Sequence, residues 1–367
     1  MTTHDERIQQ RAFEKCIPLS VTLEITLRCN LRCVHCYNFD RELSYLPERR
    51  SEEELRDDEI HRILDEVRAE GCLYLGLTGG EALMHPRIVD FVRHASDSGM
   101  AVRIKSNGTL LRPATVRRVA EAGAAAIDLS LYGSTAETHD AFVKVPGAWK
   151  RTLEGAQTAR DAGLSVKLNA VVVQSNADEV GRMLEMASEL GVSFNLDLQI
   201  TKRYDGSRSS LDLSVDRGTL ERLHRGPLRS FVPGGDATRK SIQCPCARSV
   251  CGITAFGDVY PCIGAPMRSG NLREQSFHEV WESSPQFRWI RELRTDDFPA
   301  CRSCVHMPYC RRSSGVIYSN TGVYNGPEKF GDDFVCIEAE VLHQIHDEGR
   351  ASETLPAGFT LRRHSQD

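Results

Sequence analysis

The sequence lacks the features that would assign it to a membrane or to nucleic acid. It has no apolar run long enough to span a bilayer, and its first twenty residues are charged, unlike a secretory signal. It has no strong excess of either charge, because 46 Lys and Arg oppose 51 Asp and Glu. The net charge of −5 gives no basic face of the kind that binds nucleic acid. We therefore expect a cytoplasmic protein.

Cysteine, in contrast, is abundant. The 367 residues include 13 cysteines, although a reducing cytoplasm disfavours structural disulfides. Three lie at 29–36 and eight between 244 and 336, so that only Cys16 and Cys72 are isolated. An isolated cysteine is more often a small buried apolar residue than a metal ligand. The clustering of the others predicts metal sites, with iron-sulfur clusters favoured over zinc.

The first group, Cys29, Cys33 and Cys36, forms a CxxxCxxC motif directly after an apolar, alternating run. Three thiolates on one loop can hold three irons of a 4Fe-4S cube and leave the fourth iron open to a small molecule. A zinc site with His35 as fourth ligand, a disulfide and incidental buried thiols are the alternatives. The spacing is typical of iron-sulfur loops and differs from paired CxxC zinc knuckles.

Apolar segments alternate with helical stretches over the first half of the chain, and most of these stretches end at a glycine. The predicted strands are 21–25, 73–78, 101–106, 125–131, 165–173 and 193–200. The predicted helices are 58–70, 86–98, 113–122, 148–162 and 177–190. Such βα units predict an α/β fold with a parallel sheet, either an open doubly wound sheet or a barrel. In both, ligands gather at the carboxyl ends of the strands.

Two motifs at those ends together resemble the radical S-adenosylmethionine (radical SAM) enzymes. One is the sequence CNLRCVHC after the first strand, and the other is Thr78-Gly79-Gly80-Glu81 after the second. In that family three cysteines hold a 4Fe-4S cluster and the methionine part of SAM chelates its remaining iron. The resemblance covers most of 19–200 and implies a partial (β/α)6 barrel.

The resemblance also implies contacts to SAM. Gly79 and Gly80 would let the backbone approach the amino group of the cofactor, and Glu81 would place a carboxylate nearby. The alternatives are an ordinary βα turn and a helix-terminal carboxylate. His35 would pack on the adenine. Polar residues at the strand ends are candidates for ribose or methionine contacts, although such residues also satisfy loop backbone groups; they are Ser106, Asn107, Ser130 and Asn169.

The second cysteine-rich region resembles a SPASM domain, which carries auxiliary clusters in peptide-modifying radical SAM enzymes. The resemblance implies two ligand sets, Cys301, Cys304, Cys310 and Cys336 for one cluster, and Cys244, Cys251 and Cys262 for the other. Ser314 stands where the family often has a further cysteine. Either Cys246 replaces that ligand, or one iron is open or has another ligand. Two zinc ribbons are the alternative.

These observations divide the chain into an amino-terminal extension (1–18), a radical SAM barrel (19–200), a bridging segment (201–243), a SPASM domain (244–346) and a polar tail (347–367). The resemblance implies an enzyme with SAM and three 4Fe-4S clusters that generates a 5'-deoxyadenosyl radical. We expect it to modify a ribosomally made peptide, by forming a C-C, C-O or thioether crosslink. A dehydrogenase or decarboxylase acting on a sugar or tetrapyrrole, and a non-catalytic electron carrier, are the alternatives. No catalytic acid or base is assigned.

Three partners are expected from this resemblance. They are a precursor peptide, a flavodoxin- or ferredoxin-type reductant, and a separate leader-recognition protein. The last follows because only about eighteen residues precede the barrel, too few for a leader-binding domain. The sulfatase-maturing branch is disfavoured, because Ile263 stands where that branch has an Asp. No nucleic acid or membrane partner is expected.

Overall fold

The computed structural model describes residues 4–41, 53–231, 244–331 and 333–349. Its centre is one sheet in the order β6-β5-β4-β3-β2-β1-β7-β8. Every neighbouring pair is parallel except β7 and β8. The strands are β1 (Ser20–Glu24), β2 (Tyr74–Thr78), β3 (Ala101–Ser106), β4 (Ala124–Ser130), β5 (Ser165–Val171), β6 (Ser193–Asp197), β7 (Val250–Ile253) and β8 (Val259–Tyr260).

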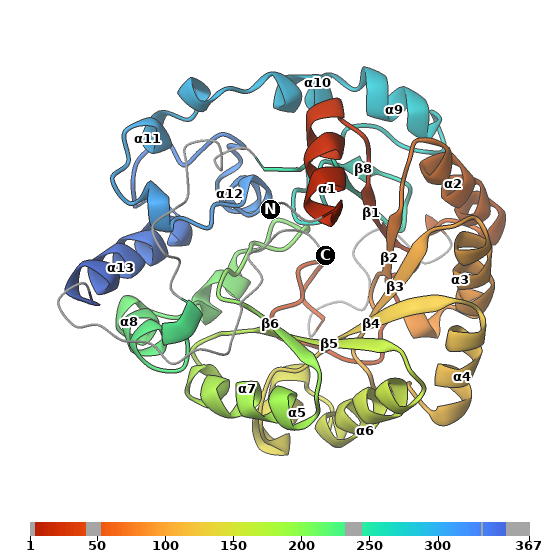
Figure 1. Ribbon diagram of the computed structural model, residues 1–367, viewed down its shortest axis with the longest axis horizontal. Helices are drawn as coiled ribbons and strands as arrows, with labels where there is room; N and C mark the ends of the chain where they lie inside the picture. The colour runs from red at the N-terminus through yellow and green to blue at the C-terminus, as the bar shows by residue number, and fades with distance from the viewer. Residues whose placement is uncertain (1–3, 42–52, 232–243, 332, 350–367) are drawn as a thin grey trace.

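Helices lie outside this curved sheet (Figure 1), which confirms the predicted α/β fold. Those of the barrel are α2 (Asp57–Ala69), α3 (Ile88–Asp97), α4 (Pro113–Glu121), α5 (Ala136–Val143), α6 (Ala148–Asp161) and α7 (Val180–Glu189). The later helices are α8 (Arg217–Arg225), α9 (Phe277–Ser283), α10 (Pro285–Glu292), α11 (Pro299–Arg302), α12 (Ser314–Thr321) and α13 (Phe334–Gly349). Among the described residues, no helix is both long enough and apolar enough to cross a bilayer.

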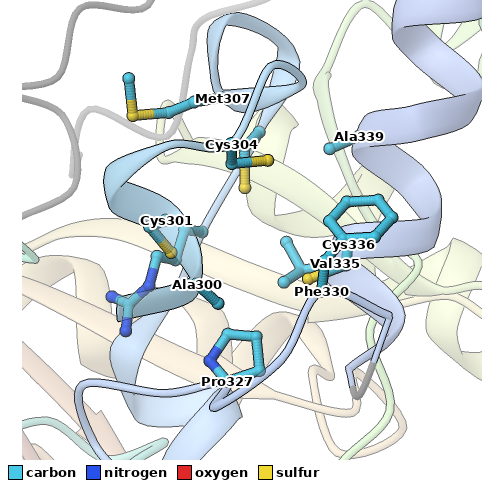
Figure 2. Close-up of a pocket in the computed structure, with 11 residues that line it drawn as sticks. Ala300, Cys301, Cys304, Met307, Pro327, Phe330, Val335, Cys336 and Ala339 are labelled. Atoms are coloured by element: carbon cyan, nitrogen blue, oxygen red, sulfur yellow. The ribbon is translucent and has the colours of Figure 1, made fainter. Parts of the chain in front are cut away.

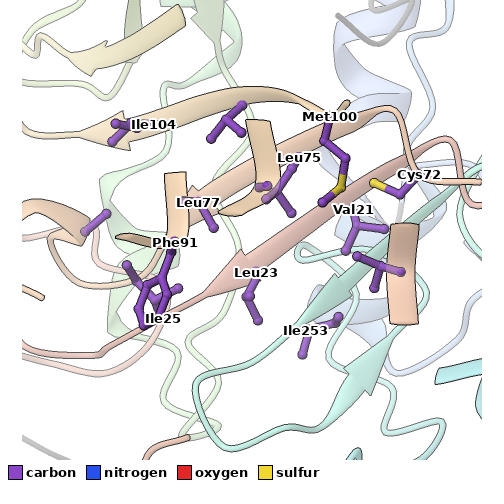
Figure 3. Close-up of a cluster of buried hydrophobic side chains, with 14 of the residues drawn as sticks. Val21, Leu23, Ile25, Cys72, Leu75, Leu77, Phe91, Met100, Ile104 and Ile253 are labelled. Carbon is purple, nitrogen blue, oxygen red and sulfur yellow. The ribbon is translucent and has the colours of Figure 1, made fainter. Parts of the chain in front are cut away.

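Side chains alternate between the two faces of each strand, and one face packs against the helices. On β1, Val21 and Leu23 are fully buried in the main apolar core. Figure 3 shows them beside Leu75 and Leu77 of β2, and Ile253 of β7. The opposite face carries polar residues and looks into the barrel. Burial of this continuous apolar layer holds the strand ends, and therefore the loops after them, in fixed positions.

Strands β5 and β6 end two or more residues earlier than the sequence predicts, because polar side chains bind the backbone there. The Oδ1 of Asp197 accepts a hydrogen bond from Gln199 N at 2.9 Å, and β6 ends at Asp197 instead of residue 200. The Oδ1 of Asn176 accepts one from Val173 N at 2.8 Å, and β5 ends at Val171 instead of residue 173. Both are local turns that replace the strand ladder.

The amino-terminal extension contains α1 (His4–Lys15), which the sequence analysis did not predict. This helix is tied to the rest of the chain at both ends. The hydroxyl of Tyr74 donates to Asp5 at 3.2 Å, and the indole N–H of Trp281 donates to Cys16 O at 2.7 Å. The extension is therefore docked against β2 and α9.

The second cysteine-rich region is joined to the barrel through the sheet itself. Strand β7 pairs with β1 over four residues, from Ser20 opposite Val250 to Leu23 opposite Ile253. In the described part of the bridging segment, α8 packs on α13, and buried His224 lies 3.3 Å from Glu338. Residues 232–243 of that segment and residues 350–367 of the predicted tail lie outside the described residues.

Candidate functional site

The first group of thiols lies on the loop after β1, at the carboxyl edge of the sheet. Burial raises the pKa of Cys29 and raises that of Cys33 well above its usual value. The charges of Cys29 and Cys36 raise the pKa of Cys33 further, as expected for three thiols in one small space. A compensating positive charge, such as bound iron, would favour the ionised form of Cys29 and Cys33.

The loop is held by backbone hydrogen bonds from two directions. Arg32 N and Val34 N donate to the carbonyls of Val143 and Phe142 at 3.0 and 3.1 Å, at the end of α5. From the bridging segment, Tyr204 N donates to Tyr37 O at 2.8 Å. The cysteines are thus presented by a braced loop. A cavity beside it encloses about 470 Å³, open solvent included, and is lined by Cys29, Asn30, Leu31, Arg32 and Arg41.

Gly79 and Gly80 bring the end of β2 against the segment that leads into the cysteine loop. Gly79 has a φ of +141°, and a Cβ there would lie 2.0 Å from Thr26 O. A Cβ at Gly80 would lie 2.4 Å from the carbonyl oxygens of Leu27 and Arg28. Gly80 N donates to Thr26 O at 2.7 Å. The glycines therefore permit contact between the two motif loops themselves, a reason that the sequence analysis did not give.

The Glu81 side chain is buried and engaged by the protein. Its carboxylate accepts hydrogen bonds from Ser106 Oγ at 2.8 Å, Asn107 N at 2.7 Å and Leu83 N at 3.0 Å. The Asn107 amide in turn donates to Asn30 Oδ1 at 2.9 Å, beside the first cysteine. Burial raises the pKa of Glu81, and these donors oppose the rise. The arrangement favours the structural alternative for Glu81 and Ser106, which join the end of β3 to the second motif.

His35 lies in an aromatic cluster next to the cysteine loop. Its ring centroid is 4.6 Å from that of Tyr132 and 4.8 Å from that of Phe142. Burial lowers the pKa of His35 to about 4, so the ring is neutral at pH 7. Ser130 and Asn169 are paired neighbours at the ends of β4 and β5, and both are partly exposed. A neutral ring and two accessible polar groups thus lie along the same edge of the sheet.

The second cysteine-rich region forms a cavity lined by four cysteines. Cys301, Cys304 and Cys310 come from the α11 loop and Cys336 from α13, and the cavity encloses about 500 Å³, open solvent included. Figure 2 shows the labelled cysteines around this space. Burial, followed by the charges of Cys301 and Cys336, raises the pKa of Cys310 to about 12. The structure therefore brings together all four members of this predicted ligand set.

A third group of thiols lies at the start of α12. The sulfurs of Cys244 and Cys246 are 3.1 Å apart, and Cys246 also contacts the thiol of Cys262. Fully buried Ser314 lies beside them, and its backbone N–H donates to Cys244. The phenol of Tyr324, which is only 3% exposed, also lies beside these thiols. Nothing in the sequence pattern had indicated Tyr324.

Cys251 points away from that group. A Cβ at Gly252 would lie 2.5 Å from Ile263 N and 2.9 Å from Cys262 C, so the segment carrying Cys262 covers the face to which position 252 points. Neighbouring residues of a strand point to opposite faces. Cys251, at 0% exposure, therefore lies on the same face as Ile253 in the main apolar core, to which Cys246 also belongs. Cys246 lies beside both Cys244 and Cys262, whereas the charge of Cys262 contributes to the raised pKa of Cys251. The set of Cys244, Cys251 and Cys262 stays a prediction.

Three tyrosines connect the first and third thiol groups. Tyr37 directly follows the last cysteine of the first loop, and its ring lies 5.2 Å from that of Tyr204. The Tyr204 ring lies 5.9 Å from that of Tyr260, which precedes Cys262 by two residues. Glu24, buried in the barrel, accepts a hydrogen bond from the Tyr37 hydroxyl at 2.8 Å. The sequence analysis did not identify this row of tyrosines, because the three residues are far apart in the sequence.

The geometry of the thiols differs from that of a single-ion site. Among the described residues, no three or more His, Cys, Asp or Glu side chains converge as the ligands of one metal ion would. Cys301, Cys304, Cys310 and Cys336 instead line one cavity together, and Cys29 of the first group lines another. Four thiolates around one cavity are a ligand set of the kind that holds a 4Fe-4S cluster.

Comparisons with family models match both halves of this arrangement. A model of the Radical SAM superfamily matches residues 23–187, which contain β2 to β5 and the first thiol group. A model of SPASM, described as an iron-sulfur cluster-binding domain, matches residues 244–305.

Two relatives match over most of their length. The chain is 30% identical over 329 residues to an AdoMet-dependent heme synthase from Methanosarcina barkeri. The aligned region covers 81% of this chain and 91% of the relative. The chain is 28% identical over 340 residues to mycofactocin maturase MftC from Mycobacterium ulcerans, covering 85% and 87%. The crystal structure of Streptococcus suis SuiB bound to S-adenosylmethionine is similar with a TM-score of 0.65 and 18% identity, over 90% of this chain and 81% of that one. The last likeness concerns the fold.

Proposed function

The chain belongs to the radical SAM superfamily and carries a SPASM iron-sulfur domain, and on this basis we propose that it modifies a peptide, forming a crosslink. The observation that carries the proposal is the contact between the three-thiol loop after β1 and Gly79–Gly80 after β2, where Gly80 N lies 2.7 Å from Thr26 O. When bound there, SAM and a 4Fe-4S cluster supply a 5'-deoxyadenosyl radical that removes hydrogen from an unactivated carbon. The protein holds the target bond and excludes water.

Cys29, Cys33 and Cys36 are the proposed ligands of the SAM-binding cluster. The backbone of Gly79 and Gly80 would face the amino group of SAM, and the neutral ring of His35 would face its adenine. Ser130 and Asn169 are partly exposed at the same edge and would contact the ribose or methionine part. Ser106, Asn107 and the Glu81 carboxylate would act indirectly, because their hydrogen bonds fix the loops.

We propose two auxiliary clusters in addition. Four thiolates, Cys301, Cys304, Cys310 and Cys336, would close one of them completely, which suits electron transfer and leaves no iron for substrate. For the other we propose Cys244, Cys246 and Cys262, with Cys251 in the core as a structural residue. Ser314 and Tyr324 would then face the remaining iron.

A peptide substrate is supported by the similarity to mycofactocin maturase over 85% of the chain. The precursor peptide and a flavodoxin- or ferredoxin-type reductant are the proposed partners, and a separate leader-recognition protein is the third. A second candidate is an oxidation or decarboxylation of a tetrapyrrole, which the 30% identity to a heme synthase favours.

Both candidates are tested in one experiment. The protein is reconstituted anaerobically with iron and sulfide, then incubated with SAM, a reductant and either candidate precursor peptides or tetrapyrroles. Mass spectrometry measures 5'-deoxyadenosine and the mass change of each substrate, which is a loss of hydrogen for a crosslink or an oxidation and a loss that includes carbon dioxide for a decarboxylation. Cys33→Ala should abolish 5'-deoxyadenosine formation, whereas Cys16→Ala, at an isolated cysteine, should not. Consumption of the tetrapyrrole alone would replace the first proposal with the second.

A further inference from the structure

Arg41 is a buried cationic residue that contacts the first thiol group and that the sequence analysis did not identify. It follows Cys36 by five residues, and its Nε donates a hydrogen bond to the Cys36 sulfur at 3.1 Å. The residue is only 8% exposed, although it carries a permanent charge. A buried guanidinium needs anionic or carbonyl partners. The partners of Arg41 therefore indicate which group its charge stabilises.

The position of the guanidinium is fixed independently of the sulfur. Its two Nη atoms both point to the carbonyl oxygen of Leu27, at 3.4 and 3.3 Å. Its central carbon lies 4.6 Å from the ring centroid of Phe39, which is 1% exposed. Leu27 N is itself bound by Glu54 at 2.6 Å. Arg41 is thus held between a braced carbonyl and a buried ring, with Nε directed at the ligand thiol.

The first thiol group is the counterpart of this cation. Arg41 Nε lies 3.1 Å from the Cys36 sulfur, and the Arg41 side chain lines the same cavity as Cys29. A cluster held by these cysteines would therefore lie directly beside a fixed positive charge.

We propose that Arg41 is a positioning residue that sets the reduction potential of the cluster bound by Cys29, Cys33 and Cys36. This inference rests on the proposed function only in requiring that a cluster binds there. A cluster gains one negative charge on reduction, and a fixed cation at a buried site stabilises that charge more than it would in water. Hydrogen bonds to cluster sulfurs act in the same direction. Arg41 would therefore make the cluster easier to reduce.

The test is an EPR-monitored redox titration of the reconstituted full chain. The spectrum of the Cys29→Ala/Cys33→Ala/Cys36→Ala variant is subtracted to isolate this cluster from any other. At the potential where the wild-type cluster is half reduced, Arg41→Gln should show at least a tenfold lower ratio of reduced to oxidised cluster. For one electron this corresponds to about 59 mV toward more negative potential. Arg41→Lys, which keeps the charge but loses the planar fork, should lie between the two.

Arg32→Gln is the matched control, because Arg32 belongs to the same loop and lines the same cavity but has an exposed side chain. It should titrate like the wild type. An Arg41→Gln potential equal to that of the wild type, or an equal shift in Arg32→Gln, would overturn the proposal. If Arg41→Gln binds no iron, Arg41→Lys decides: a wild-type potential in that variant also overturns it.

Iron and sulfide contents are measured for every variant, so that loss of the cluster is separated from a change in potential. The titration needs no peptide or tetrapyrrole. A failure to modify any substrate would therefore count against the proposed function and leave the potential of Arg41→Gln as an independent result.

Discussion

The two buried cysteines Cys246 and Cys251 allow a direct test of the first auxiliary ligand set. Cys246 is 3% exposed and Cys251 is 0% exposed, so Cys→Ala removes the same atoms from equally buried positions. If each cluster contains four irons, three clusters bind about twelve irons per chain. Cys246→Ala should lower this to about eight, because only Cys244 and Cys262 would remain. Cys251→Ala should leave it at about twelve.

The free energy of unfolding of the apoprotein is a second measurement. Cys251→Ala should lower it although this variant keeps its iron. Cys246 and Cys251 both belong to the main apolar core, and truncation of either to Ala leaves a small cavity there. The expected cost is about 1 kcal/mol in the free energy of unfolding of the apoprotein. Iron and sulfide analysis, Mössbauer spectroscopy and urea denaturation are the assays. Loss of about four irons in Cys251→Ala, with full iron retained in Cys246→Ala, would refute the reasoning from strand alternation.

Two further predictions concern the loops around the site. Gly79→Ala should destabilise the apoprotein by several kcal/mol, because its Cβ would lie 2.0 Å from Thr26 O, whereas Gly163→Ala has open space and should cost about 1 kcal/mol for its positive φ. Equal costs in urea denaturation would contradict this. His139, 1% exposed, has a pKa lowered by burial to about 4. Its contribution to stability is present above pH 6.5 and should be lost as the pH falls toward 4, by up to about 3 kcal/mol in the apoprotein. His139→Asn, which keeps an acceptor for Tyr132 N, should flatten the measured pH dependence; an unchanged slope would count against it.

The barrel could be predicted because its strands and helices are regular and local in sequence. Strand β3 lies at Ala101–Ser106, as predicted, and the CxxxCxxC and GGE motifs lie after β1 and β2. Strand β7 could not be predicted, because its four residues include Cys251 and Gly252 and its partner β1 lies far earlier in the chain. A strand of that length has no recognisable period.

The details of the site depended on information that spacing does not contain. The different surroundings of Cys246 and Cys251 depend on the turn before β7, which carries Cys246, and on the face of β7 that Cys251 occupies. Arg41 has no motif, because its role comes from burial and from the direction of one N–H bond. Glu81, in contrast to Arg41, belongs to a motif that the sequence analysis identified. The motif did not show that the Glu81 carboxylate accepts hydrogen bonds from Ser106 and Asn107.

The pairing of β7 with β1 has a consequence for attempts to shorten the protein. With β7 present, β1 has a neighbour on both sides, β2 and β7. Removal of the residues after the barrel would leave β1 as an edge strand, with unpaired N–H and C=O groups beside apolar Val21 and Leu23. Exposed edges of this kind template aggregation. The amino-terminal portion is therefore not a detachable module, because the strand that presents its cysteines depends on a later part of the chain to be an interior strand.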